Sequence, residues 1–348
     1  MQIRNRSRIA RVSKKRRRKW FKRILLIGSI LGIVLLIYAI TSVWSALSGG
    51  HNDLGKSNLR DNQIDLNKDP FAILLIGSDA RKEGSSNWRP DVLMVAAINP
   101  KKKSMKLVSI PRDTWVEIAN TNGGKAKINH AAHYGYVKGI DPIKNTRETV
   151  ENFLNIPIDH YSKVNFKGFM DVVDILGGVD VNVKRSFTME SFGGKKLYFR
   201  EGPMHLNGEH ALAYARMRKK DPLGDKGRNI RQQEVLAQIM AKMVSLNGLT
   251  QFNQLTQKVG ENVSYSIRPT EMPSLFAIYK EIPKKNIETI TIQTTFERRQ
   301  GQSVEIVSEE EKHRVSQILQ QQLEWKPKHN PNENQNQEED KELTFSLL

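Results

Sequence analysis

The sequence predicts an α/β fold built on a mixed central sheet and preceded by one membrane-spanning helix. Between residues 71 and 323, short apolar segments typical of strands are interleaved with segments whose apolar residues recur at helical spacing. Strands that alternate with helices along a chain indicate the α/β class. Ahead of this region, residues 24–40 contain no charged side chain and directly follow a strongly basic segment.

The apolar segment predicts a membrane anchor over residues 24–46. Its uncharged part is 17 residues long, the lower limit for crossing a hydrocarbon core of ~30 Å, and a weakly apolar flank extends it. The preceding residues 1–23 hold twelve Lys and Arg and no Asp or Glu, a pattern typical of the cytoplasmic side. We therefore expect a single-pass protein of the cell membrane with a cytoplasmic N-terminus and an extracytoplasmic remainder. A cleavable signal peptide is the main alternative, but the apolar run is long for one and no Ala-x-Ala follows it.

The charge of the chain is concentrated in its first residues. The formal net charge is +18, yet the chain after residue 23 holds 43 basic and 37 acidic residues. Twelve basic residues beside a bilayer are explained by topology and anionic lipid, so no nucleic-acid partner is expected. The chain has no cysteine, which excludes a disulfide framework, a zinc–thiolate site and a cysteine nucleophile.

Composition divides the rest of the chain into three parts. Residues 47–69 are polar and rich in Gly, Asn and Asp, and are predicted to form a stalk. Residues 70–325 carry the strand and helix patterns and are predicted to be the folded extracytoplasmic domain. Residues 326–348 are rich in Asn, Gln and Glu and are predicted to be a disordered tail.

The elements of the folded domain follow from apolar spacing. Continuous apolar runs typical of buried strands open the domain, and the run that follows them alternates. The last predicted helix begins with Ser308 and Glu311, the pattern of a capping box. Strands are predicted at 71–77, 92–98, 105–110, 161–165, 179–183 and 287–293, and helices at 144–154, 166–176, 229–245, 270–280 and 308–323.

Charged residues gather where three of these strands end. If strands 71–77, 92–98 and 105–110 alternate in direction, the ends of the first and third meet the start of the second at one edge of the sheet. Carboxylates among arginines suit Mg²⁺ and a diphosphate, because Mg²⁺ prefers oxygen ligands and Arg binds phosphate with a planar fork. The alternative is a surface cluster of ion pairs, which stabilises little. The residues expected at this edge are Asp79, Arg81, Arg89, Asp91, Arg112 and Asp113.

A second group of basic residues lies between 214 and 232. Arg216 and Arg218 share a face only if the chain there is extended. The helix that follows has an apolar stripe over Val235–Met243 which, projected back, places Arg228 and Gln232 on its inward face. A helix N-terminus favours anions. Arg231, in contrast, is expected in a solvated first turn.

These residues fall in motifs that closely resemble the LytR–CpsA–Psr family. The resemblance covers about residues 70–245, with the motifs in the family's order and the same anchor topology. One departure is Trp88, where small or polar residues are common in the family. The motifs are Leu75-Ile-Gly-Ser-Asp79-Ala-Arg81, Arg89-Pro-Asp91, Leu107-Val-Ser-Ile-Pro-Arg112-Asp113, Val173-Asp-Ile-Leu-Gly-Gly-Val-Asp180, Leu206-Asn-Gly-Glu-His-Ala-Leu-Ala-Tyr-Ala-Arg216-Met-Arg218, and Gly224-Asp225 followed by Arg228-Asn-Ile-Arg-Gln232.

The resemblance implies a fold and an activity. The fold is an α/β/α sandwich with a central mixed, largely antiparallel sheet and an apolar pocket for a polyprenyl chain. The activity is that of a polyisoprenyl-teichoic acid–peptidoglycan phosphotransferase. Such an enzyme moves a glycopolymer phosphate, commonly wall teichoic acid, from an undecaprenyl pyrophosphate carrier to a peptidoglycan sugar hydroxyl. The partners implied are this lipid-linked glycopolymer, peptidoglycan and the lipid bilayer.

The resemblance also implies roles for individual residues. Asp79 and Asp91 would hold Mg²⁺, or Mn²⁺ in its place. Asp91 and Asp113 are both candidates for the base that takes the acceptor proton. The catalytic set would be Asp91, Arg112, Arg216 and Arg218, and the pyrophosphate would contact Arg81, Arg89, Arg112, Lys127, Arg216, Arg218, Arg228 and Gln232.

Three other functions are compatible with parts of the sequence. A pyrophosphatase that releases the lipid-linked polymer would use the same site with water as the acceptor. A regulator that binds nucleic acid through the basic N-terminus is disfavoured by the anchor, since only 23 residues would face the cytoplasm. A non-enzymatic wall-anchoring protein would show no metal dependence.

Overall fold

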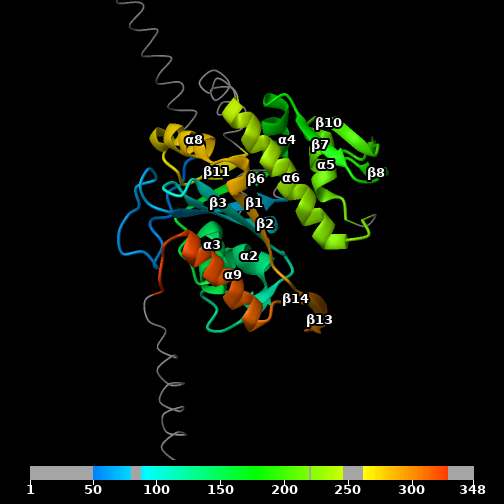
Figure 1. The fold of residues 1–348 in the computed structure, drawn as a ribbon. Helices are drawn as coiled ribbons and strands as arrows, with labels where there is room; N and C mark the ends of the chain where they lie inside the picture. The colour runs from blue at the N-terminus through cyan, green and yellow to red at the C-terminus, as the bar shows by residue number, and fades with distance from the viewer. Residues whose placement is uncertain (1–49, 80–87, 219–220, 246–261, 328–348) are drawn as a thin grey trace, which may run out of the picture.

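The computed structural model describes residues 50–79, 88–218, 221–245 and 262–327 and shows a six-stranded mixed sheet between two layers of helices (Figure 1). The strand order is β11-β6-β1-β2-β3-β12. The pairs β1–β6 and β3–β12 are parallel, and the other three pairs are antiparallel. The strands are β1 (Phe71–Ser78), β2 (Pro90–Asn99), β3 (Ser104–Ile110), β6 (His160–Asn165), β11 (Val263–Tyr265) and β12 (Ile287–Thr291).

Alternating side chains send the two faces of the sheet into two separate apolar cores. On β1, Leu74 and Ile76 enter one core, whereas Phe71 and Ile73 enter the other. Successive side chains of a strand point to opposite faces, so the continuous apolar runs in the sequence reflect burial on both sides. The mixed α/β class with a central mixed sheet is thereby confirmed.

Helices cover both faces. On the lower side in Figure 1 lie α2 (Ala131–Val137), α3 (Pro142–Leu154) and α9 (Glu309–Gln322), and on the upper side lie the others. Ser308 caps α9 as predicted, because its hydroxyl accepts a hydrogen bond from the Glu311 amide at 3.1 Å. The upper helices are α4 (Phe166–Ile175), α5 (Gly208–Arg216), α6 (Gly224–Ser245) and α8 (Met272–Glu281).

The smaller sheets are two-stranded and form around this framework. They were not predicted, apart from the strand at 179–183. Three short 3₁₀ helices, Ile128–His130, Pro269–Glu271 and Lys284–Asn286, complete the described elements. The two-stranded pairs are β4 (Trp115–Glu117) with β5 (Lys125–Lys127), β7 (Val179–Val183) with β10 (Gly202–Leu206), β8 (Phe187–Glu190) with β9 (Lys196–Phe199), and β13 (Thr295–Arg299) with β14 (Gln302–Ile306).

The predicted membrane anchor at 24–46 and the basic tail at 1–23 lie outside the described residues, as do residues 328–348 of the predicted tail. Within the described ranges, no helix combines the length and the apolar character that a membrane crossing requires. The anchor and the tail therefore stay predictions.

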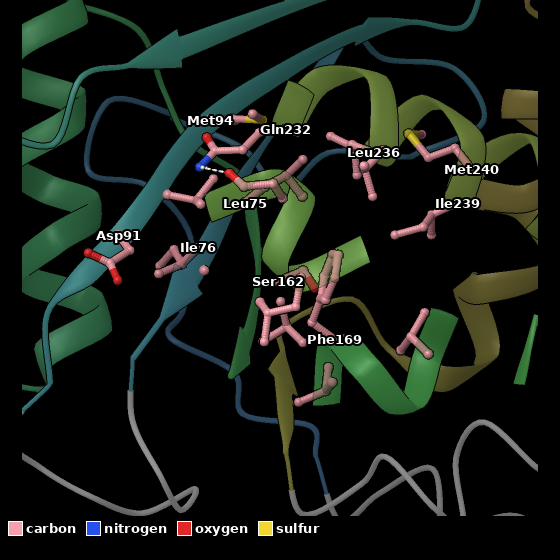
Figure 2. A pocket seen from close by; sticks show the side chains of 18 of the residues that line it. Leu75, Ile76, Asp91, Met94, Ser162, Phe169, Gln232, Leu236, Ile239 and Met240 are labelled. Carbon is pink, nitrogen blue, oxygen red and sulfur yellow. Dashed lines mark hydrogen bonds between the residues drawn. The ribbon is translucent and has the colours of Figure 1, made fainter. Parts of the chain in front are cut away.

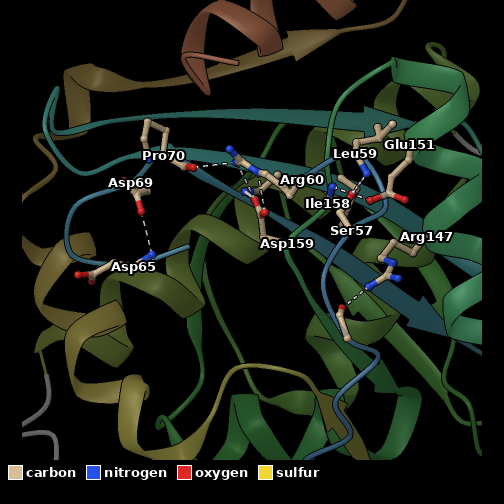
Figure 3. A network of polar contacts seen from close by, with 12 residues as sticks. Ser57, Leu59, Arg60, Asp65, Asp69, Pro70, Arg147, Glu151, Ile158 and Asp159 are labelled. Atoms are coloured by element: carbon tan, nitrogen blue, oxygen red, sulfur yellow. Dashed lines mark hydrogen bonds and ion pairs between the residues drawn. The ribbon is translucent and has the colours of Figure 1, made fainter. Parts of the chain in front are cut away.

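Residues 50–69, which the sequence predicts as part of a stalk, make specific contacts with the domain (Figure 3). The Arg60 guanidinium binds both carboxylate oxygens of the buried Asp159, at 3.0 and 3.1 Å. Arg147 of α3 donates to the Gly55 carbonyl at 2.8 Å. Leu66 is buried in the core on the upper face of the sheet. The segment lies along the domain for most of its length, so the ordered unit includes residues before 70.

Candidate functional site

A cavity of about 1160 Å³ lies between the sheet and the helices of the upper layer. Apolar side chains of β1, β2, α6 and α8 form most of its wall, including Leu75, Met94, Leu236 and Met240 (Figure 2). The inward stripe predicted for α6 is therefore part of this wall. Such a concave apolar site with a few polar groups is the usual form of a small-molecule or lipid site.

Six of the predicted site residues line this same cavity. Two of them lie where β3 ends and β2 begins, because these antiparallel strands place their ends at one edge of the sheet, and the other four come from the end of α5 and from α6. The structure brings the described residues of the predicted edge close together. The six residues are Asp91, Arg112, Arg216, Arg218, Arg228 and Gln232.

Arg112 stands between two carboxylates. Its guanidinium lies 3.5 Å from Asp91 and 3.5 Å from Asp113. Lys127, at the end of β5, contacts the other oxygen of Asp113 at 3.1 Å. Lys127 does not line the cavity, and Asp113 connects it to Arg112, which does. The Arg112 Nε atom is buried, and none of the described residues accepts a hydrogen bond from it.

Asp91 and Asp79 form the acidic part of the edge. Burial raises the pKa of Asp91, and the charge of Asp79 raises it further, while Arg112, Arg216 and Arg228 oppose the shift. Asp79 is exposed and accepts a hydrogen bond from the Arg89 backbone amide at 3.4 Å. The two carboxylates are therefore close enough to interact electrostatically, although Asp79 does not line the cavity.

Arg89 lies at the rim of the site. Its side chain is exposed and outside the cavity wall. Burial lowers the pKa of His130, and the charges of Arg89 and Lys127 lower it further. Arg81, the remaining predicted site residue, lies outside the described residues. Trp88 beside Arg89 is buried in the core, with the Lys163 ammonium 4.8 Å from its ring centre.

The end of α5 aims two arginines at the cavity. The helix ends at Arg216, Met217 takes an extended conformation (φ −62°, ψ 126°), and Arg218 follows. The Arg216 guanidinium packs on the Phe166 ring, 4.6 Å from its centre. The extended residue between them lets both arginines line the cavity.

Arg231 holds this turn in place, contrary to the prediction that it lies in a solvated first turn. Its side chain is buried, and the residue is 8% exposed. It donates to the Tyr214 carbonyl at 3.1 Å and to the Met217 carbonyl, and it pairs with the Asp221 carboxylate. On the neighbouring face of α6, Arg228 and Gln232 line the cavity as predicted, and the Gln232 amide donates to the Ala215 carbonyl at 3.4 Å.

Two groups of residues were not predicted as parts of the site. Phe166 directly follows β6, and its ring contacts the Arg216 guanidinium. No motif in the sequence indicated that Phe166 belongs to the site. Helix α8 was predicted, but its place against the cavity was not. The apolar spacing of Met272, Leu275 and Tyr279 is the signal that could have assigned one face of α8 to a buried surface.

Within the described ranges, no group of three or more His, Cys, Asp or Glu side chains could hold a metal ion by itself. The pair Asp79 and Asp91 is compatible with Mg²⁺, which commonly takes one or two carboxylates and completes its shell with water and phosphate oxygens. Any such ion would therefore depend on the substrate for part of its coordination.

The comparisons agree with this architecture. The model of the LytR_cpsA_psr family matches residues 37–321. The chain is 43% identical over 288 residues to the polyisoprenyl-teichoic acid–peptidoglycan teichoic acid transferase TagV of Bacillus subtilis (strain 168), covering 79% of this chain and 71% of that protein. It is 37% identical over 280 residues to TagU of Bacillus licheniformis, a transferase of the same description, covering 78% and 87%.

Solved structures show the same fold. The crystal structure of B. subtilis TagV matches with a TM-score of 0.64 at 41% identity, covering 75% of this chain and 99% of that one. The structure described as TagT bound to LI-WTA matches with a TM-score of 0.64 at 32% identity, covering 78% and 99%. The match of the family model over most of the sequence, together with these relatives, shows that the chain belongs to the LytR–CpsA–Psr family.

Proposed function

We propose that this protein transfers a teichoic acid from a polyprenyl pyrophosphate carrier to peptidoglycan. The observation that carries the proposal is the two-part cavity, which has a deep apolar wall and a mouth lined by four arginines. A lipid pyrophosphate has the complementary form, with a long apolar chain and a compact doubly charged head. The relatives whose names describe this transfer support the substrate assignment.

The apolar wall and the arginines of the cavity would each contribute to binding of the donor. Each buried CH₂ group contributes about 0.8 kcal/mol, so a polyprenyl chain can bind tightly without specific polar contacts. Arg112, Arg216, Arg218 and Arg228 supply permanent charge and planar donors for the phosphate oxygens. Arg89 and Lys127 lie beside these and add positive potential at the rim.

The acidic pair is compatible with Mg²⁺ or Mn²⁺ in the donor complex. Asp79 and Asp91 would hold the ion, and the repulsion between them, which contributes to the raised pKa of Asp91, would be relieved by a cation. When bound, the ion would supply charge neutralisation on phosphate oxygens. The same need is met in part by Arg112, which lies against Asp91.

The reaction is a phosphoryl transfer without a covalent enzyme intermediate. An acceptor hydroxyl attacks the glycan-side phosphorus, the bond from this phosphorus to the bridging oxygen breaks, and polyprenyl phosphate leaves. The hydroxyl proton passes to a carboxylate of this edge, Asp91 or Asp113. The arginines stabilise the charge that spreads over the phosphate oxygens, and the fixed cavity places donor and acceptor in line.

We also propose that the domain is held outside the cytoplasmic membrane by the helix predicted at 24–46. The basic residues before it and the lipid-shaped cavity after it support this placement. Only the outer side of the membrane gives an enzyme access to both a membrane-bound lipid donor and an acceptor in the cell wall.

The test uses the full-length chain in detergent micelles with a pyrophosphate-linked lipid glycan and uncrosslinked glycan strands of peptidoglycan. Mass spectrometry then looks for the covalent glycan–phosphate–peptidoglycan product, with Mg²⁺ or with EDTA. We expect a Mg²⁺-dependent product that Asp91→Asn abolishes and that the control Asp171→Asn, at an ion pair on the surface of α4, leaves unchanged. Free glycan phosphate without conjugate would instead establish the pyrophosphatase, and an unchanged donor would contradict both enzymes.

A further inference from the structure

The β8–β9 hairpin is firmly attached to the domain beside the cavity mouth. Its inner face carries Phe187 and Phe199, whose rings stack with centres 4.4 Å apart. Phe199 also packs against Tyr214 of α5, at 6.0 Å between ring centres. The inner face thereby belongs to the core formed by α4, α5 and α6, so the orientation of the outer face is fixed.

The outer face of the hairpin is turned toward the cavity. Thr188 pairs across the strands with Tyr198, and Glu190 pairs with Lys196. Thr188, Glu190 and Lys196 line the cavity, while Tyr198 is 63% exposed with the Lys196 ammonium 5.6 Å from its ring centre. Side chains of opposed residues stand next to each other on one face of a strand pair, so an exposed aromatic ring lies among hydrogen-bonding groups at the cavity opening.

A second aromatic ring is displayed at the turn of the hairpin. The buried Ser191 hydroxyl accepts hydrogen bonds from the Gly193 and Lys195 amides, at 3.2 and 3.1 Å, and so braces the turn. Phe192 within this turn is 50% exposed, and its ring meets Phe166 edge to face with centres 5.5 Å apart. Since Phe166 carries the Arg216 guanidinium, Phe192 is separated from the arginine-lined mouth by one ring.

We propose that the outer face of the β8–β9 hairpin, together with Phe192, is a saccharide subsite that holds the glycan strand of the acceptor. The proposal rests on the transferase function proposed above. Aromatic faces are electron-rich and attract the C–H groups on the apolar face of a sugar ring. Thr188, Glu190 and Lys196 offer the donors and acceptors that sugar hydroxyls need.

The charge of this face favours the acceptor over the donor polymer. The paired positions Glu190 and Lys196 carry one negative and one positive charge, whereas a phosphate-linked polymer favours a surface of uniformly positive charge. Geometry agrees, because the donor lipid occupies the cavity and an in-line attack brings the acceptor hydroxyl to the phosphorus from outside it.

The position of the hairpin disfavours a membrane contact. The described chain begins at Gly50, whose carbonyl accepts a hydrogen bond from the Tyr265 amide of β11 at 2.9 Å. Figure 1 shows α8 and β8 at opposite ends of the upper layer, with β11 nearer to α8. A domain held at the bilayer by the segment before Gly50 would therefore present this hairpin away from the lipid surface.

The test compares the full-length wild type with the double variant Phe192→Ala/Tyr198→Ala. Both residues are exposed, so the variant is expected to fold, and thermal melting verifies this. Phe192→Trp is the conservative variant, and Tyr136→Ala, which removes a ring that is 48% exposed on α2, is the matched control. Three quantities are measured: the affinity for soluble uncrosslinked glycan strands without donor, the KM and kcat for transfer, and the affinity for the lipid donor.

We expect the double variant to raise the dissociation constant and the KM for the glycan strand about tenfold. The kcat at saturating acceptor and the donor affinity are expected to stay within about twofold, and Phe192→Trp is expected to retain acceptor affinity. Unchanged acceptor affinity overturns the proposal, as does a loss confined to donor binding or to association with anionic vesicles. The two proposals can also fail separately. If the wild type binds glycan strands and the double variant does not, but the wild type transfers no polymer, the transferase function is overturned and the saccharide subsite is retained.

Discussion

Arg112 lies between two carboxylates at the cavity mouth. It lies 3.5 Å from both Asp91 and Asp113, and its Nε atom is buried. These neighbours fix the plane of the guanidinium, so its remaining N–H groups are directed before the substrate arrives. A planar donor set in a fixed orientation contributes to transition-state stabilisation without reorganisation.

Arg112→Lys is therefore expected to lower kcat about a hundredfold, because an ammonium keeps the charge but loses the planar pair of donors. Initial transfer rates with the full-length protein measure the effect. Arg314→Lys is the control, since Arg314 pairs with Glu311 on α9, away from the cavity. A rate for Arg112→Lys within about threefold of wild type would remove Arg112 from the catalytic set.

Arg231 acts on the site through the backbone. Its guanidinium binds the Met217 carbonyl, between the two arginines of the α5 terminus, and also the Asp221 carboxylate. Arg231→Met should cost about 2 kcal/mol of unfolding free energy, because the partly buried Asp221 carboxylate loses its charge-assisted hydrogen bond. It should also lower kcat, because Arg216 and Arg218 lose their fixed turn.

The double variant Arg231→Met/Asp221→Asn separates the two effects. Removal of the unpaired charge should restore most of the stability but not kcat, and this result would identify Arg231 as a positioning residue. Urea unfolding gives the stability and steady-state transfer gives kcat. Recovery of both quantities together would mean that Arg231 serves stability alone.

At the scale of elements, the long strands and helices could be predicted and the short ones could not. Five strands of the central sheet and helices α3, α4, α6, α8 and α9 carry enough periodic apolar residues to be recognised from local spacing, whereas the three-residue strand β11 was not predicted. Helix α5 is short and Ala-rich, and a close approach to α4 helps define it. A Cβ atom on Gly208 would lie 2.3 Å from the Met170 carbonyl oxygen, a constraint that appears only once both helices are placed.

The candidate site shows the same limit. Strand direction alone brought Asp91 and Arg112 to one edge, and the stripe of α6 turned Arg228 and Gln232 inward. The burial of Arg231 depends on the backbone between α5 and α6 folding over that helix, so the spacing of apolar residues in α6 could not reveal it. Contacts that arise between distant loops leave no periodic signal in the sequence.

The segment before β1 is another case where polar composition concealed packing. Residues 50–69 are held by buried charged partners on the domain, and one of these, Glu151 of α3, is itself only 3% exposed. Its carboxylate accepts hydrogen bonds from the Ile158 amide, at 2.9 Å, and from Ser57 (Figure 3). Burial raises the pKa of Glu151, although these hydrogen bonds and Arg147 oppose the shift.

A raised pKa in the folded state makes stability fall as pH rises from the unfolded value of 4.5 through the folded pKa. Glu151→Gln keeps an acceptor oxygen and removes the buried charge. The variant is therefore expected to be about 1 kcal/mol more stable than wild type at pH 7 and nearly equal to it at pH 4.

Urea unfolding at both pH values measures this difference. Glu310→Gln, at an exposed position of α9, is the control and should show no such pH-dependent gain. The opposite result would be a stability difference between Glu151→Gln and wild type that becomes less favourable to the variant from pH 4 to pH 7. That result would mean that the ionised carboxylate stabilises the docked segment.

At the scale of the whole molecule, the proposed anchor would bring the cavity and the docked segment into one functional arrangement. The chain enters the described domain at Gly50, which bonds to Tyr265, and Tyr265 lines the cavity. The Asn52 amide also donates to the Tyr265 carbonyl at 2.8 Å. An anchor immediately before this point would hold the apolar wall of the cavity near the bilayer surface, where a lipid donor could move from the membrane into the cavity over a short path.

A flexible linker inserted before Gly50 tests this arrangement. Twenty Gly and Ser residues extend over about 25 Å on average, which lowers the effective concentration of the cavity at the membrane surface. We expect transfer from a donor embedded in vesicles to fall about fivefold, because the domain now samples many positions and orientations above the lipid. Transfer from a short-chain donor in detergent should not change, since the linker leaves the docked segment and the site intact.

The same linker placed after residue 327 is the control. Equal loss of transfer with both donors would mean that the insertion damages the domain. If the vesicle rate is also unchanged, the direct hand-over of lipid from bilayer to cavity is contradicted, and the donor must reach the cavity after leaving the membrane surface.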